Sequence, residues 1–396
     1  MRSTVFSIAL ALAICVTAAP AGETVPASYM TGFKNPKVET SVGGQALCIS
    51  GTLDITASAN NTRINAPEPA NQTMVTELVA EAVQIDTKLY TRILGDPVVI
   101  SGTYSIYAQL CFPHSGINVN TVQFLIHGGG FDHSYWDFAP GYSYVDAAAA
   151  QGYTTFAYDR LGSGLSDHPD PAQVVQYPLQ VAIAHELIQK LRTGGVAAQT
   201  FQHVVGVGHS LGSFQTYGVT AQHPNDLDAA VLTGFSTSSS GTPVAFAGLG
   251  LSIAAQNQPH RFAGLPNGYF TANAIESNQF FFFRAPGFDP ALLELSEANK
   301  QLISMGEFLG VSATLEPTQF TGPIDVVNGA NDLPNCHGNC LLPYNLAASV
   351  KDMYYPMASN SSSWYLAPVA GHGLNLHYSA SEAYEHILDF IRKNGL

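Results

Sequence analysis

Charged residues are scarce in this chain of 396 residues. They make up 11% of the sequence, and the 15 Lys and Arg are outnumbered by 29 Asp and Glu, which gives a formal net charge of −14. This charge argues against nucleic acids or anionic membrane surfaces as partners, because both would repel the protein. The 46% of hydrophobic residues nevertheless indicates a well-filled core. We therefore expect a folded protein that acts on a small molecule.

Long apolar runs are also missing beyond the N-terminus, where no segment reaches the roughly 18 apolar residues of a membrane span. Residues 1–21 combine a basic start, a short apolar run and small residues, which is typical of a secretory signal peptide. We expect cleavage between residues 18 and 21 and a secreted, extracellular protein, with an uncleaved anchor as the alternative. In a eukaryotic host three tripeptides would then accept glycans, at Asn60, Asn71 and Asn360.

Cysteine is rare, with five residues, and Cys15 lies in the predicted signal peptide. The other four allow three pairings, of which we favour Cys48 with Cys111 and Cys336 with Cys340. The close spacing of the second pair leaves a metal site as an alternative. However, a fourth ligand is missing nearby, and an oxidising compartment favours a disulfide. We predict neither a metal nor a cofactor.

Short apolar runs alternate with helical patterns in residues 116–235 and again in 318–396. This alternation predicts an α/β fold with a doubly wound, mostly parallel sheet. The strands are expected at 122–126, 153–158, 203–207, 229–234, 323–329 and 363–368, and the main helices at 179–192 and 381–392. Residues 22–115 hold two β-rich runs, 44–55 and 98–112, around a possible helix at 75–89. They predict an N-terminal β-rich extension that leads into the sheet and has no chemistry of its own.

The alternation stops between residues 236 and 317, where Ser, Gly, Pro and aromatic residues dominate before an expected helix at 290–308. An insertion of this length after a strand is typical of a cap or lid over the carboxyl ends of the strands. Its four consecutive phenylalanines, 280–283, either form the core of the cap or line the substrate cavity. The candidate substrate-binding residues are Phe131, Trp136, Phe281 and Phe282.

Gly208-His209-Ser210-Leu211-Gly212 follows an apolar strand and precedes a possible helix. This context fits the G-x-S-x-G nucleophile elbow, in which a strained turn exposes the serine hydroxyl. A serine also needs a base, and the base needs an acid that fixes its tautomer. The order Ser210, Asp332, His372 satisfies this requirement, since each residue follows the end of a predicted strand.

Other aspartates and histidines are less well placed to act as the acid or the base. Asp325 lies inside its strand, and His337 and His377 lack a comparable place at a strand end. His127 and His209 adjoin the site but are expected to bond to loop backbone.

A second motif, His127-Gly128-Gly129-Gly130, directly follows the strand at 122–126. Its N–H groups can complete an oxyanion hole with the N–H of Leu211, although a flexible glycine loop is the alternative. Asp159 and Arg160, after the next strand, are expected to hold a loop beneath the serine.

These motifs together resemble the α/β-hydrolase fold superfamily, in the branch with a cap after the sixth strand. The resemblance covers residues from about 122 to 396 and implies that Gly129 and Leu211 donate to the oxyanion. With the predicted signal peptide, the unmatched N-terminal residues make the chain similar to secreted fungal serine hydrolases.

The resulting hypothesis is a secreted serine hydrolase that cleaves a carboxylic ester, possibly a lactone, through an acyl-enzyme. A tailoring hydrolase or cyclase for a large apolar natural product, a peptidase, and a non-catalytic binding protein on the same fold remain alternatives. The sequence makes no prediction of the oligomeric state.

Overall fold

The structure is a computed structural model that describes residues 26–114, 120–310 and 315–396. The predicted signal peptide, 1–21, lies outside the described residues. Within those residues, no helix combines the length and the apolar character needed to cross a membrane.

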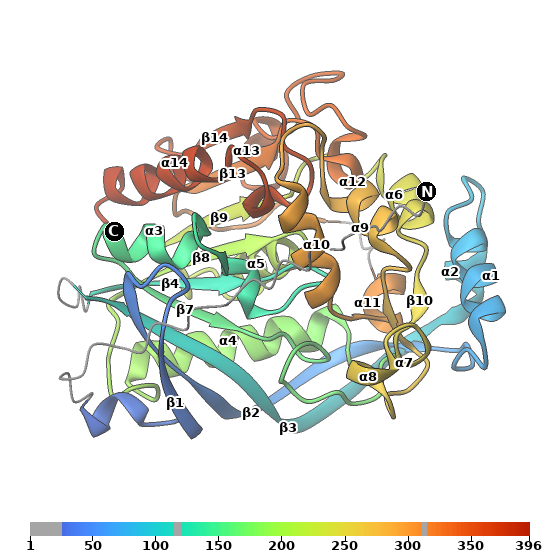
Figure 1. Ribbon diagram of the computed structural model, residues 1–396, viewed down its shortest axis with the longest axis horizontal. Coiled ribbons are helices and arrows are strands. Elements are labelled where there is room, and N and C mark those ends of the chain that lie inside the picture. The colour runs from blue at the N-terminus through green and yellow to red at the C-terminus, as the bar shows by residue number, and fades with distance from the viewer. Residues whose placement is uncertain (1–25, 115–119, 311–314) are drawn as a thin grey trace, which may run out of the picture.

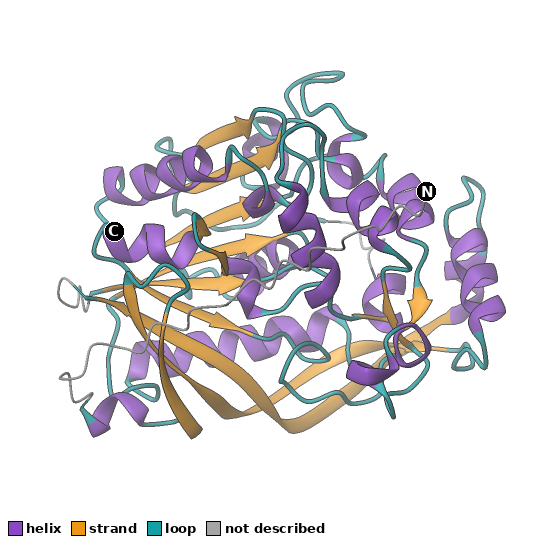
Figure 2. Ribbon diagram, in the orientation of Figure 1, coloured by secondary structure: helices purple, strands orange, loops and turns teal. Residues whose placement is uncertain are grey.

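A nine-stranded sheet forms the centre of the molecule, with the order β1-β2-β3-β7-β4-β8-β9-β13-β14 (Figure 2). Strands β1, β2 and β3 are antiparallel to their neighbours, and the six strands from β7 to β14 are parallel. The predicted α/β class and mostly parallel sheet are therefore confirmed. The strands are β1 Lys34–Thr40, β2 Ala46–Ile64, β3 Leu94–Pro113, β4 Thr121–Ile126, β7 Thr154–Tyr158, β8 His203–His209, β9 Ala229–Thr233, β13 Ile324–Gly329 and β14 Ser363–Ala367.

Both faces of the sheet are covered, which explains why its central strands are apolar throughout. In β4, Phe124 and Leu125 are both fully buried but belong to separate hydrophobic clusters on opposite faces. Phe124 shares its cluster with Leu187 of α4, and Leu125 with Leu388 of α14. The helices that flank the sheet are α3 Tyr144–Ala150, α4 Tyr177–Thr193, α5 Leu211–Gln222, α13 Ser349–Tyr354 and α14 Ala380–Lys393.

The N-terminal extension is built on a β2–β3 hairpin that is longer than the sequence predicts. Cys48 and Cys111 are direct cross-strand partners and form a disulfide. The helix expected at 75–89 is two shorter helices, α1 Gln72–Ala82 and α2 Leu89–Ile93. The helix begins earlier than expected because the side chain of Asn71 caps it, accepting a hydrogen bond from the N–H of Met74.

The segment between β9 and β13, residues 234–323, is called the cap segment after the role predicted for it, and its described residues fold mainly into short helices with a small antiparallel sheet, β10-β11-β12. The prediction of a single helix at 290–308 is wrong, because α10 ends at Asn299 and the chain then forms strand β12, which pairs with β11. Buried Lys300 marks the break, where its Nζ donates to the carbonyl of Ala272 at 2.8 Å. The elements are α6 Thr242–Leu249, β10 Ser252–Ile253, α7 Ala254–Asn257, α8 Pro259–Phe262, β11 Tyr269–Thr271, α9 Ile275–Phe282, α10 Pro290–Asn299, β12 Ile303–Ser304 and α11 Met305–Gly310.

The N-terminal extension also supports this cap segment, a contact that the sequence does not indicate. Figure 1 shows α1 and α2 beside β10. Gln72 of α1 donates to the carbonyl of Leu251 and accepts from the N–H of Ile253, both at 2.9 Å. The remaining short elements are η1 Ala27–Met30, η2 His133–Trp136, β5 Asp137–Ala139, β6 Tyr142–Ser143, α12 Leu333–Cys336 and η3 Leu374–Leu376.

Candidate active site

Ser210 occupies a strained turn between β8 and α5. Its backbone has φ 54° and ψ −117°, a conformation with positive φ that is unusual for a residue with a side chain. The flanking glycines make this turn possible. A Cβ on Gly208 would lie 2.4 Å from the carbonyl oxygen of Gly212, and one on Gly212 would lie 2.0 Å from that of Ile126. The turn therefore has the geometry of a nucleophile elbow.

Ser210, His372 and Asp332 form a hydrogen-bonded series at the carboxyl ends of β8, β14 and β13. The Oγ of Ser210 lies 2.8 Å from Nε2 of His372, and Nδ1 of His372 lies 2.7 Å from Oδ2 of Asp332. Asp332 and the His372 side chain are almost fully buried, whereas Ser210 is partly exposed. In this arrangement the imidazole can take the serine proton while the carboxylate fixes its tautomer.

Asn335 completes the surroundings of Asp332 and is not identified by the sequence analysis. Its backbone N–H donates to Oδ1 of Asp332 at 2.9 Å, so Asp332 caps the short helix α12. Its side-chain amide donates to the carbonyl of Gly234 at 2.6 Å. Asn335 follows Asp332 by three residues, the spacing typical of a helix cap, and this spacing could have indicated the bond from its backbone N–H. The Cys336–Cys340 disulfide follows directly.

The competing acid and base candidates have structural partners. Asp325 accepts a hydrogen bond from Ser363 at 2.7 Å and lies 3.1 Å from His386. Nε2 of His377 accepts from the N–H groups of Gly371 and Arg284. Burial lowers the pKa of His377 to about 4, so this ring stays neutral and holds the loop of His372 against the cap segment. His337 ends α12 in a left-handed conformation.

Leu211 is the first residue of α5, so its N–H has no acceptor within the helix, and Gly129 lies in the loop that follows β4. The loop of Gly129 passes close to the nucleophile, since a Cβ on Gly128 would lie 3.0 Å from the Cβ of Ser210. A Cβ on Gly129 would in turn lie 3.0 Å from Leu211 and 3.3 Å from Ile303. Only glycine lets the backbone come this near.

The carbonyl of Gly128 is held by two side chains. Nδ1 of His127 lies 2.8 Å from it, and Nη2 of Arg160 donates to it at 3.3 Å. The N–H of Arg160 donates to Nε2 of His127, which places the ring proton on Nδ1. Burial, and then the charge of Arg160, lower the pKa of His127 to about 3. The ring is thus a neutral donor to loop backbone, as expected.

His209 differs from its expectation, because its hydrogen-bond partner is a side chain rather than loop backbone. Its Nδ1 lies 3.0 Å from Oγ1 of Thr233, and its ring stacks on Tyr135 with centroids 4.4 Å apart. Burial, followed by the charges of neighbouring histidines, lowers its pKa well below the usual range. His209 therefore packs beneath the elbow as a neutral ring.

Asp159 holds the loop after β7 by accepting from the N–H groups of Leu165 and His133, each at 2.8 Å. Its Oδ1 also lies 2.6 Å from Nδ1 of His133. Burial opposes the charge on His133, but the Asp159 carboxylate outweighs it and raises the pKa of His133 to about 9. The expected loop-holding role of Asp159 is therefore seen.

The four candidate substrate-binding aromatics separate into two groups. Phe281 and Phe282 of α9 contact His372, with ring centroids 5.4 and 5.9 Å apart. Phe131 packs on Phe282 at 4.8 Å. Trp136 belongs to the same buried cluster but packs edge-on against Tyr135 and Tyr144.

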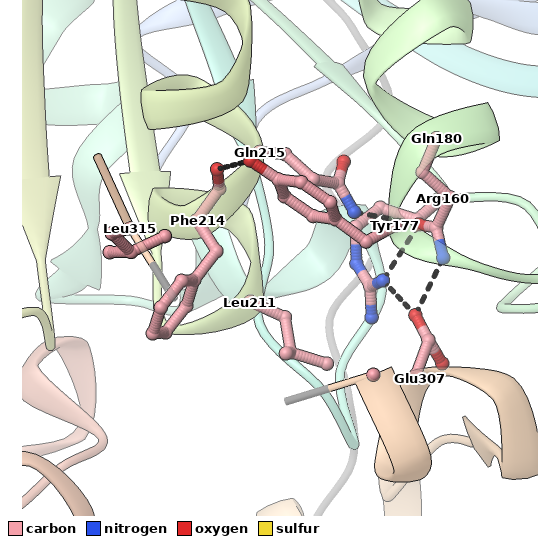
Figure 3. Close-up of a pocket in the computed structure, with 9 residues that line it drawn as sticks. Arg160, Tyr177, Gln180, Leu211, Phe214, Gln215, Glu307 and Leu315 are labelled. Carbon is pink, nitrogen blue, oxygen red and sulfur yellow. Dashed lines mark hydrogen bonds and ion pairs between the residues drawn. The ribbon is translucent and has the colours of Figure 1, made fainter. Parts of the chain in front are cut away.

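A pocket opens next to Leu211, the neighbour of Ser210 (Figure 3). Its empty volume is about 470 Å³, part of it open to solvent. One wall is apolar or aromatic, formed by Tyr177, Leu211, Phe214 and Leu315, and the other is polar, formed by Arg160, Gln180, Gln215 and Glu307. The polar groups bond to one another, since Gln180 accepts from Gln215 at 2.7 Å and donates to Glu307 at 2.8 Å. The four aromatic candidates do not line this pocket.

Two groups of side chains in the described residues have the composition of a metal site. They are His185 with His223 and Asp226, and Asp132 with His133 and Asp159. In each group an aspartate already accepts a hydrogen bond from a histidine, at 2.6 Å. Neither group contains Ser210, His372 or Asp332.

A parallel sheet that carries a serine elbow, a histidine and an aspartate at its carboxyl edge defines the class of α/β hydrolases. The chain belongs to the alpha/beta hydrolase family, whose sequence profile matches residues 124–387. No curated protein matches the sequence significantly.

Among solved structures, an epoxide hydrolase from Vigna radiata is similar, with a TM-score of 0.51 and 14% identity over 73% of this chain and 95% of that one. An esterase from Thermogutta terrifontis has a TM-score of 0.47 and 15% identity over 73% of this chain and 94% of that one. At such identities the likeness concerns the fold.

Proposed function

We propose that this protein is a serine hydrolase that cleaves a carboxylic ester, possibly a lactone, with Ser210 as nucleophile. The observation that carries the proposal is the continuous hydrogen-bonded series from Ser210 through His372 to buried Asp332. A serine hydroxyl becomes a competent nucleophile when a base is within hydrogen-bond reach and an acid orients that base.

The reaction proceeds in two halves. Ser210 Oγ attacks the carbonyl carbon while His372 takes its proton, and the oxyanion accepts from the N–H groups of Gly129 and Leu211. His372 then gives the proton to the leaving alcohol as the ester bond breaks, which leaves the acyl group on Ser210. A water molecule, deprotonated by His372, releases the acid and restores the serine.

The lining of the pocket beside Leu211 supports a substrate with an apolar group. An apolar acyl or alcohol group fits its wall of Tyr177, Leu211 and Phe214, because Gln180, Gln215 and Glu307 opposite bond to one another. Phe281 and Phe282 pack against the ring of His372 and add apolar surface beside it. Together these surfaces favour esters with an apolar group over peptides.

We further propose that the protein is secreted. The two disulfides suit an oxidising compartment, and the glycosylation candidates Asn60, Asn71 and Asn360 are exposed.

The decisive experiment compares wild type with Ser210→Ala in p-nitrophenyl ester hydrolysis and in labelling by a fluorophosphonate. We expect Ser210→Ala to lose at least about 10⁴-fold in kcat and to lose the label. Ser240→Ala, at an exposed serine, serves as control and should behave as wild type. Labelling of Ser210→Ala at the wild-type level would refute the proposal. A panel of esters, lactones, thioesters and peptides then defines the substrate.

A further inference from the structure

A buried ion pair joins the cap segment to the core of the sheet. Nη1 of Arg160, which follows β7, bonds to Oε1 of Glu307 on α11 (Figure 3). The Arg160 side chain is fully buried and that of Glu307 is 5% exposed. Burying two charges costs so much desolvation energy that such a pair is weak evidence for stability. The contacts of the pair indicate a role other than stability.

The other end of the guanidinium reaches the loop beside the nucleophile. Nη2 of Arg160 donates to the carbonyl of Gly128. That carbonyl belongs to the same peptide unit as the N–H of Gly129. Because the peptide unit is planar, holding its oxygen fixes the direction in which its N–H points. His127 supplies the second donor to this oxygen, at 2.8 Å.

Glu307 is itself fixed by the cap segment. Its Oε2 accepts from the N–H of Ser304 in β12 at 2.9 Å, and its own N–H donates to Oγ of Ser304 at 3.0 Å. Gln180 of α4 accepts from Arg160 and donates to Glu307, each at 2.8 Å. The position of the Glu307 carboxylate therefore depends on the position of the cap segment.

We infer that Glu307 and Arg160 are positioning residues for the oxyanion hole, and that they couple the seating of the cap to the direction of the Gly129 N–H. The inference rests on the proposed function. Glu307 places the guanidinium, and the guanidinium and His127 together orient the Gly128–Gly129 peptide. The cation also polarises this peptide toward the substrate oxygen. Neither Glu307 nor Arg160 contacts the reacting atoms in this scheme.

The test uses the full-length protein with three variants: Glu307→Gln, Arg160→Lys, and Arg160→Met combined with Glu307→Met. The amide of Glu307→Gln lacks the charge, and the ammonium of Arg160→Lys lacks the fork that bridges Glu307 and Gly128. We expect kcat to fall about 10- to 100-fold, since full loss of an oxyanion donor costs about 10²- to 10³-fold. KM should change less than about threefold, because substrate binds before the oxyanion forms.

The double variant separates positioning from stability. Removing both buried charges should return the melting temperature toward that of wild type, while kcat stays low because the Gly128 carbonyl has lost one of its two side-chain donors and keeps only His127. A boronic acid, which forms a tetrahedral adduct on Ser210, should lose affinity in proportion to kcat. Glu297→Gln is the matched control. Glu297 pairs with Lys300 inside the cap segment, so its loss should leave kcat unchanged.

Recovery of both melting temperature and kcat in the double variant would overturn the inference, and so would wild-type kcat in Arg160→Lys and Glu307→Gln. Equal losses in Glu297→Gln would also overturn it, since they would reflect general loosening of the cap segment. These outcomes are distinct from failure of the proposed function, in which wild type itself would neither hydrolyse esters nor label at Ser210.

Discussion

At the scale of single residues, the two oxygens of Asp332 have different tasks. Oδ2 faces Nδ1 of His372, and Oδ1 caps α12 through the N–H of Asn335. Both contacts require an acceptor. An amide in this place would present its NH₂ group either to the ring N–H or to the capping N–H, so one contact is lost in either orientation.

We predict that Asp332→Asn lowers kcat about 10³- to 10⁴-fold, because the amide allows the wrong tautomer of His372. Stopped-flow or steady-state ester hydrolysis measures this loss. Asp325→Asn is the matched control, since Asp325 is an equally buried carboxylate of β13 that bonds to Ser363 and His386. It should lower stability but keep kcat. Equal activity of the two variants would contradict the assignment of the acid.

His133 should make stability depend on pH. Its pKa is about 9 in the folded protein because of Asp159, against about 6.5 in an unfolded chain. Since the folded-state pKa is raised, the stabilisation is fully present below pH 6.5 and is lost as the pH rises through about 9. We predict a loss of about 3 kcal/mol over this window, measured by denaturant unfolding at a series of pH values. His133→Gln should flatten the profile; an unchanged slope would show that another group titrates.

At the scale of elements, the proposed active site depends on how short loops at the ends of β13 and β14 are held. The loop after β13 carries Asp332 and Asn335 and is closed by the Cys336–Cys340 disulfide. The loop after β14 carries His372 and is held by His377, whose ring accepts from Gly371 and from Arg284 of the cap segment. The alignment of acid and base is thus set by two separate tethers.

We predict that Cys336→Ala with Cys340→Ala lowers kcat about 10-fold, because a loosened loop no longer holds Asp332 in productive geometry. The free energy of unfolding should fall by about 2 kcal/mol, as expected for a very small disulfide loop. Ester hydrolysis and denaturant unfolding measure the two effects. A loss of stability with wild-type kcat would show that the tether does not serve the site.

At the scale of the whole molecule, the N-terminal hairpin is part of the hydrolase rather than an appendage. β3 pairs with β7 of the central sheet, and Gln72 on the connection between β2 and β3 supports the cap segment. The Cys48–Cys111 disulfide closes a separation of 63 residues within this hairpin. This disulfide restricts the conformations of the unfolded chain. In the folded protein it does not contact Ser210, His372 or Asp332.

We therefore predict that Cys48→Ala with Cys111→Ala lowers the free energy of unfolding by about 2–4 kcal/mol and leaves kcat of the folded protein unchanged. Denaturant unfolding and active-site titration measure the two quantities. Compared with the variant at Cys336 and Cys340, this one should affect stability more and activity less. The reverse order would contradict the separation of the two roles.

The sequence by itself determines the parts whose signal is local. The glycines around Ser210 are required by a turn of five residues, and Asp332 and His372 each follow a strand that its own apolar run defines. The helix expected at 75–89 begins a few residues earlier, as α1, and the helix expected at 290–308 ends at Asn299, next to the bond of Lys300 to the carbonyl of Ala272.

Only the tertiary structure decides the contacts between distant segments. Arg160 and Glu307 are 147 residues apart, and neither position has a periodic or motif signal that names the other. Trp136 and Phe281 are both large apolar residues of the same buried cluster, yet of the two only Phe281 packs against the ring of His372. The physical reason is that hydrophobic burial is non-directional, so the sequence shows which side chains leave water, while packing decides which of them meet at the active site.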